Sequence, residues 1–87
     1  MDKKIKKELI AKANLLEPVI RIGKSGLTNN VIREIKKQLK KRRLIKIKIL
    51  KSALEKTNKK IFAKDIAEKT DSELVCQIGF IIVLNKK

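Results

Sequence analysis

The sequence predicts one α/β domain, residues 1–87, of the two-layer α+β type, in which helices pack on a mixed four-stranded sheet. Three segments repeat apolar residues at the helical spacing, and four shorter segments alternate apolar and polar residues or are apolar throughout. Proline, glycine and short polar stretches separate them. The predicted order is αβαβαββ, and a chain of 87 residues is too short for a second domain.

The first helix is predicted over Asp2–Leu16. Its apolar residues recur at the helical spacing and form one stripe: Ile5, Leu9, Ala13 and Leu16. Pro18 forces the residue before it into extended backbone, which ends the helix. A short strand, Val19–Ile22, follows, with Ile20 and Ile22 on one face because side chains alternate along a strand.

A short loop with two glycines joins this strand to the next helix. Gly23 and Gly26 allow a sharp turn and a close approach to a ligand, because neither carries a Cβ. Lys24 and Ser25 lie between them, and Thr28, or an asparagine after it, is suited to cap the helix. The free amides and partial positive charge of a helix N-terminus favour phosphate, so the loop is predicted to bind an anion.

The second helix is predicted over Asn29–Lys41. Its buried side consists of Val31, Ile32, Ile35 and Leu39. Four cations on its opposite side follow the i, i+3, i+4, i+7 pattern: Arg33, Lys36, Lys37 and Lys40. Like charges at this spacing repel each other, so the row predicts an anionic partner; a merely solvated helix back is the alternative. Glu34 lies toward the edge of the row, and Arg42 and Arg43 extend the positive charge beyond it.

The second strand, Leu44–Leu50, alternates strictly, so Lys46 and Lys48 are predicted on a wet face opposite three buried isoleucines. A third helix is predicted over Asn58–Lys69, after a stretch, Ser52–Lys60, that mixes helix formers with turn residues. Its inward residues are Ile61, Phe62, Ala63, Ile66 and Ala67.

The chain closes with two strands, Leu74–Ile78 and Phe80–Leu84. Only Gly79 separates them, which predicts an antiparallel hairpin. The last strand is apolar at every position and is therefore expected in the middle of the sheet. Cys76 lies in an apolar run and is interpreted as a reduced core thiol.

The charge constrains the partners. The chain has 24 Lys and Arg against nine Asp and Glu, a formal net charge of +15. Such a balance points to nucleic acid or an acidic surface. An incidental excess of lysine, from biased codon usage or adaptation to heat, is the alternative.

Several classes of function are disfavoured. Without histidine and with one cysteine, the common zinc sites and the usual general bases cannot be assembled, so we expect no metal, no cofactor and no enzyme. Gly23-Lys24-Ser25 looks superficially like a nucleotide-binding loop, but Pro18 stands where that motif needs its first glycine. No signal peptide is visible, and the longest apolar run is far below the about 20 residues of a membrane span. We therefore expect a cytoplasmic monomer without membrane contact.

The ordered pattern resembles the CRM (YhbY-like) domain family over essentially the whole chain. The matching stretches are Gly23–Thr28 after the first strand, Val31–Ile35, Leu44–Lys48 and Gly79–Leu84. The resemblance implies sheet order 1-2-4-3, a fold similar to the C-terminal domain of the third bacterial translation initiation factor, and RNA binding. Bacterial members associate with precursors of the large ribosomal subunit, and plant members assist group II intron splicing. The family loop falls on Gly23–Gly26.

We therefore predict a protein that contacts structured RNA, with a ribosomal RNA precursor as target and assembly of the large subunit as role. A basic structural ribosomal or architectural nucleic-acid-binding protein is the alternative; a KH domain is a further rival, but its glycine loop joins two helices. The predicted RNA-contacting residues are Arg21, Gly23, Lys24, Ser25, Gly26, Thr28, Arg33, Lys36, Lys37, Lys40, Arg42 and Arg43. Lys46 and Lys48 would join them only if their face bordered the same surface. Phe62 and Phe80 are assigned to the core, which leaves no aromatic platform for bases.

Overall fold

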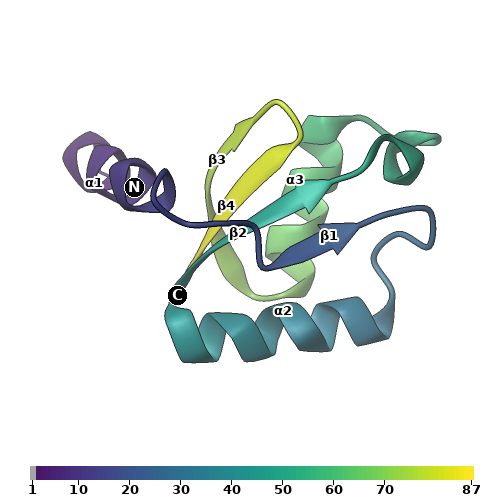
Figure 1. Cartoon of the computed structure of the whole chain (residues 1–87), viewed down its shortest axis with the longest axis horizontal. Coiled ribbons are helices and arrows are strands. Elements are labelled where there is room, and N and C mark those ends of the chain that lie inside the picture. Colours follow the sequence, from purple (N-terminus) through teal and green to yellow (C-terminus); the bar gives the residue numbers. More distant parts are fainter. Residues whose placement is uncertain (1) are drawn as a thin grey trace.

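The computed structural model describes residues 2–87 and has the predicted order of elements (Figure 1). The helices are α1 (Lys3–Ala13), α2 (Asn29–Arg42) and α3 (Lys59–Lys69), with a short 3₁₀ turn, η1 (Lys51–Leu54). The strands are β1 (Ile20–Ile22), β2 (Leu44–Ile49), β3 (Ser72–Ile78) and β4 (Ile81–Lys86). None of the helices in the described part is long and apolar enough to cross a membrane.

The strands form one sheet of order β1-β2-β4-β3, which confirms the predicted mixed topology. β1 runs parallel to β2, because α2 carries the chain back between them, whereas β4 is antiparallel to both of its neighbours. The central place of β4 accounts for the apolar run Ile81–Leu84, whereas the strand continues two residues further than predicted, through Asn85 and Lys86. Ile82 and Leu84 face one side, Val83 faces the other, and all three are buried.

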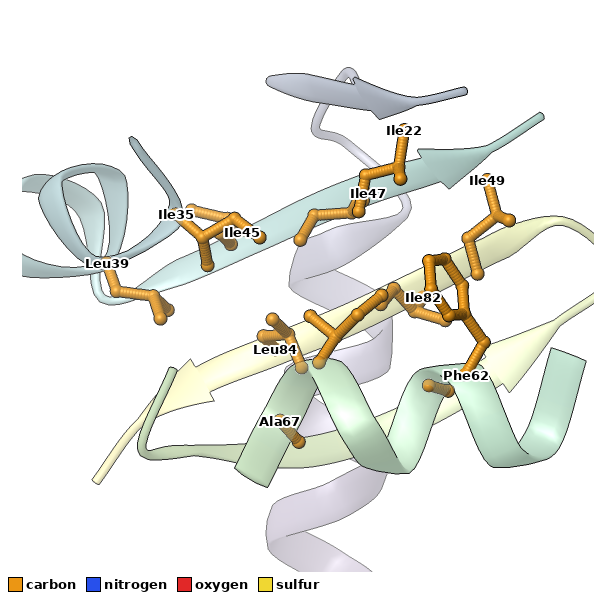
Figure 2. Packing of buried hydrophobic residues seen from close by; sticks show 12 residues of the cluster. Ile22, Ile35, Leu39, Ile45, Ile47, Ile49, Phe62, Ala67, Ile82 and Leu84 are labelled. Atoms are coloured by element: carbon orange, nitrogen blue, oxygen red, sulfur yellow. The ribbon is translucent and has the colours of Figure 1, made fainter. Parts of the chain in front are cut away.

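The main core lies between one face of the sheet and the two helices α2 and α3 (Figure 2). Ile35 and Leu39 reach it from α2, and Phe62 and Ile66 from α3. The strands supply Ile22, Ile45, Ile47, Ile49, Ile82 and Leu84. A fully buried isoleucine contributes about 1.5–3 kcal/mol relative to an exposed one, so this cluster supplies most of the stability of a small domain.

The N-terminal helix α1 covers part of the opposite face through a smaller cluster. Ala13 is buried against Val75 and Val83, and Leu9 and Ile10 pack beside it. The helix ends at Ala13, not at the predicted Leu16, because the amides of Leu15 and Leu16 donate to carbonyls three residues back and the chain leaves the helix in a tighter turn. The first turn of the helix extends beyond its contact with the sheet, so half of the surface of Ile5 is exposed (51%). Asp2 lies outside the helix and caps it by accepting from the Lys4 amide at 2.9 Å.

Two residues assigned to the core lie elsewhere. Ile61 is 60% exposed, because α3 turns Phe62 and Ile66 toward the sheet and leaves Ile61 on its outer side. Phe80 precedes β4 in a two-residue turn after Gly79, whose φ of +58° suits a tight hairpin. Its ring is half-buried, and the Lys59 ammonium lies 4.5 Å from the ring centroid.

The third strand begins at Ser72, two residues before its predicted start. Thr70 and Ser72 share a hydrogen bond of 2.8 Å between their buried hydroxyls, which satisfies both groups inside the protein. The strand register shifts between Leu74 and Cys76. Cys76 is only half-buried beside α1, and desolvation raises the pKa of its thiol above the ordinary value.

Candidate nucleic-acid interface

The glycine loop is a closed turn at the carboxyl end of β1. The Gly26 amide donates to the Gly23 carbonyl at 2.9 Å, and the exposed Lys24 and Ser25 form its tip. Gly26 has a φ of +69°, a conformation that strains other residues, so the loop needs glycine there. A Cβ on Gly23 would make only ordinary contacts, at 3.5 Å from Leu50 Cδ1 and 3.6 Å from Ser52 Oγ.

The loop leads directly into the N-terminus of α2. Thr28 caps the helix as predicted, its Oγ1 accepting from the Val31 amide at 3.2 Å. The amides of Lys24, Ser25 and Leu27 donate to no backbone carbonyl within residues 2–87. Exposed amides beside a helix N-terminus and a lysine offer hydrogen bonds and positive potential to a phosphate oxygen.

The cations of α2 lie on its outer surface. Lys37 lies about 200° around the helix axis from the buried Ile35, and Arg33 and Lys40 flank it. Lys36 is turned toward the C-terminal end of α3, where it borders a shallow cavity with Lys40. The ion pairs among the described residues, Lys69–Asp65 and Lys87–Asp71, include no α2 cation. We define Arg33, Lys36, Lys37 and Lys40 as the α2 basic face.

The acid of α2 does not neutralise this face. Glu34 accepts a hydrogen bond from Gln38 at 3.2 Å, and Gln38 in turn accepts from Arg42 Nε at 3.2 Å. These three residues run along one edge of the helix, and Arg42 borders the linker that contains Pro18. Asp71 borders the same cavity as Lys36 and Lys40, but its carboxylate pairs with Lys87 at 3.5 Å, so the face keeps a net positive charge.

Arg42 and Arg43 lie at the far end of α2 from the glycine loop. Arg43 ends the helix with a φ of 66°, and its carbonyl accepts from the Lys86 amide at 2.7 Å. A helix of 14 residues is about 21 Å long, so the predicted residues span that distance along the surface. Figure 1 shows the loop at one end of α2 and the C-terminus of the chain at the other.

The structure does not bring Arg21 together with the α2 basic face. Ile20 and Ile22 face the core, so Arg21 projects from the opposite side of β1. Its register partner on β2 is Lys48. Lys46 shares this side, and its ammonium donates to the Leu16 carbonyl at 3.1 Å. Lys46 and Lys48 therefore do not border the α2 basic face.

The segment after β2 contributes residues that the sequence did not reveal. The Leu50 amide donates to the Ile22 carbonyl at 2.8 Å, which holds η1 beside the glycine loop. Lys24 borders a shallow cavity of about 270 Å³ together with Ser52 and Lys56, and Ala53 and Glu55 complete its lining. The parallel pairing of β1 and β2 could have revealed these residues. It places the carboxyl ends of both strands, and the segments that follow them, at one edge of the sheet.

The chain is similar in sequence to several known proteins. The sequence pattern of the CRS1/YhbY (CRM) domain matches residues 1–86. A Methanocaldococcus jannaschii protein named a probable RNA-binding protein is 44% identical over 81 residues, which cover 93% of this chain and 60% of that relative. The chain thus spans less than two thirds of the length of that relative. A Bacillus subtilis protein, also named a probable RNA-binding protein, is 37% identical over 84 residues, which cover 97% of this chain and 85% of its own length.

A solved structure shares the fold. The solution structure of a Staphylococcus aureus protein, described as a candidate RNA-binding protein, superimposes with a TM-score of 0.82 at 36% sequence identity. The superposition covers this whole chain and 88% of that chain. At this identity and coverage, the likeness extends to every helix and strand described above.

Proposed function

This chain belongs to the CRS1/YhbY (CRM) domain family, and we propose that it is a non-enzymatic protein that binds structured RNA. The glycine loop holds a phosphate, and the α2 basic face follows the adjoining sugar-phosphate backbone. One observation carries the proposal: Lys24 and loop amides that donate to no backbone carbonyl stand at the start of a helix whose outer cations lack ion-pair partners within residues 2–87.

The chemistry of this surface favours the RNA backbone over its bases. Amides, ammonium and guanidinium groups donate hydrogen bonds to phosphate oxygens, whereas stacking on bases needs exposed aromatic rings. The chain has no Trp or Tyr; Phe62 is buried, and Phe80 lies in the β3–β4 turn with Lys59 over its ring. We therefore expect recognition of RNA shape with modest sequence preference.

Salt dependence tests this part of the proposal. Lys24 of the loop and the four cations of the α2 basic face would neutralise about five phosphates, so log K should fall with log salt concentration at a slope of about −3.5 to −4.5. Titrating a folded RNA hairpin at several salt concentrations measures the slope. An affinity that does not change with salt concentration would contradict binding to the RNA backbone.

We further propose that the RNA is a precursor of large-subunit ribosomal RNA, and that binding aids assembly of that subunit. The support is the family resemblance, since bacterial members associate with such precursors. Tagged protein in fractionated cell extracts should co-sediment with precursor particles and be depleted from mature ribosomes. A stable presence in mature ribosomes would instead indicate a structural role, and absence from both would contradict a ribosomal target.

A further inference from the structure

The face of the sheet opposite α2 and α3 is only partly covered. The smaller cluster under α1 involves Leu44, Val75 and Val83, at one end of that face. Beyond it, one residue from each strand forms a row in register across the sheet: Arg21, Lys48, Ile81 and Ile78. Arg21, Lys48 and Ile78 are exposed, and the row contains no acid.

The two cations of this row repel each other. Arg21 and Lys48 are register partners on adjacent strands, and like charges directly opposite each other destabilise a sheet. Neither forms an ion pair among residues 2–87. Lys46, also on this face, donates to a neutral carbonyl, so its charge stays uncompensated as well. An anion on this face would relieve the repulsion.

We propose that this second face also binds the RNA backbone, so that one domain holds two RNA segments on opposite sides of its sheet. The inference rests on the proposed function and extends it to a bridging activity. RNA is the favoured occupant because Arg21 lies only two residues before the glycine loop. Phosphate contacts at the loop therefore lie close to the start of this row.

The two basic faces point in opposite directions, so each requires its own RNA segment. Arg21 and Lys48 lie on the face of the sheet that points away from the core. The α2 basic face lies on the outer side of α2, on the other side of the core. Ile22 and Ile49, which alternate with these cations on β1 and β2, belong to the core between the sheet and the helices α2 and α3 and are buried. A rigid RNA duplex lying on one face cannot contact the other, so a second segment must occupy it.

Energy transfer between two RNA hairpins tests the bridging. The hairpins share no complementary sequence, one carries a donor dye and the other an acceptor, and both are in excess over protein. We expect transfer with the unaltered chain and its loss to the protein-free level with Arg21→Glu plus Lys48→Glu. That variant should still bind a single hairpin through α2. Arg21→Gln plus Lys48→Gln, which avoids charge reversal, should weaken transfer in the same direction.

A matched control is Lys60→Glu plus Lys64→Glu on the exposed side of α3, which changes the net charge equally and should keep the transfer. Sedimentation must show one protein with two hairpins. The inference is overturned if the unaltered chain binds a hairpin without transfer, if the Arg21 and Lys48 variants transfer normally, or if each bridge contains two protein copies. None of these results affects the proposed function, because each leaves binding of a hairpin through the loop and α2 intact. If the unaltered chain bound no hairpin at all, the proposed function would fail instead.

Discussion

The helices α2 and α3 cover the same face of the sheet and bury similar apolar sides, yet their outer sides differ. α3 exposes cations and acids together, and Lys69 pairs with Asp65 at 3.5 Å. Residues 20–51, which include α2, hold twelve Lys and Arg but one acid, whereas residues 52–87 hold seven and five. Since mixed charges suffice for α3, packing does not require the cation-only face of α2. That difference is the reason we propose α2 as the binding element.

The largest expected effect is on stability, and it compares a buried residue of α2 with an exposed residue of α3. Ile35→Ala should lower the free energy of unfolding by about 2–5 kcal/mol, because Ile35 is fully buried. Ile61→Ala on α3 should change it by less than about 0.5 kcal/mol, since that side chain is mostly exposed. Urea unfolding monitored by circular dichroism measures both. Equal losses would mean that Ile61 packs in the core after all.

The next effect compares the outer sides directly. Lys37→Glu plus Lys40→Glu should weaken binding to an RNA hairpin on the order of 10- to 100-fold, because it removes two cations and adds two repulsive charges. The same reversal at Lys60 and Lys64 changes the net charge identically and should cost much less. Mobility-shift titrations at one salt concentration compare them. Similar losses would show that net charge, not position, determines affinity.

A smaller effect is expected at the loop. Lys24→Glu should weaken RNA binding about tenfold without changing the melting temperature, because Lys24 is exposed and makes no core contact. Lys56→Glu, across the shared cavity, tests whether the η1 side contributes. Unchanged affinity in a folded Lys24→Glu protein would remove the loop from the binding site.

The smallest effect is a change of slope. Lys36→Ala plus Lys40→Ala should reduce the salt dependence of RNA binding by about two, because each lysine that binds a phosphate adds about one to the slope. Measuring affinity at several salt concentrations gives the slope. An unaltered slope would mean that these two lysines are solvated and bind no phosphate.

Local patterns of the sequence predicted most of the fold. The strict alternation from Leu44 identified β2, and Thr28 was one of the candidate caps predicted from their place at the start of the helix. The complete strand order came from the family resemblance, since spacing along the chain predicted only the pairing of the last two strands. Ile61 and Phe80 were misassigned because their exposure depends on how α3 and the hairpin turn are oriented against the sheet.

The candidate site was predictable where it is continuous in sequence. Gly23–Gly26 and the cations of α2 follow one another along the chain, so a local pattern revealed them. Ser52 and Lys56 reach the loop only through the pairing of β1 with β2. Arg21 is adjacent to the loop in sequence, but strand alternation places its side chain on the other face. Residues joined by tertiary contacts, or separated by them, needed the structure.

The most direct measurement of the central claim is backbone NMR of the chain titrated with a folded RNA hairpin. Phosphate held by the loop should shift the amide signals of Lys24, Ser25 and Leu27 most strongly, followed by those along α2. The amides of α3 should change little. If the RNA binds while the loop amides stay unshifted and the changes gather on α3, the glycine loop and α2 are not the binding site.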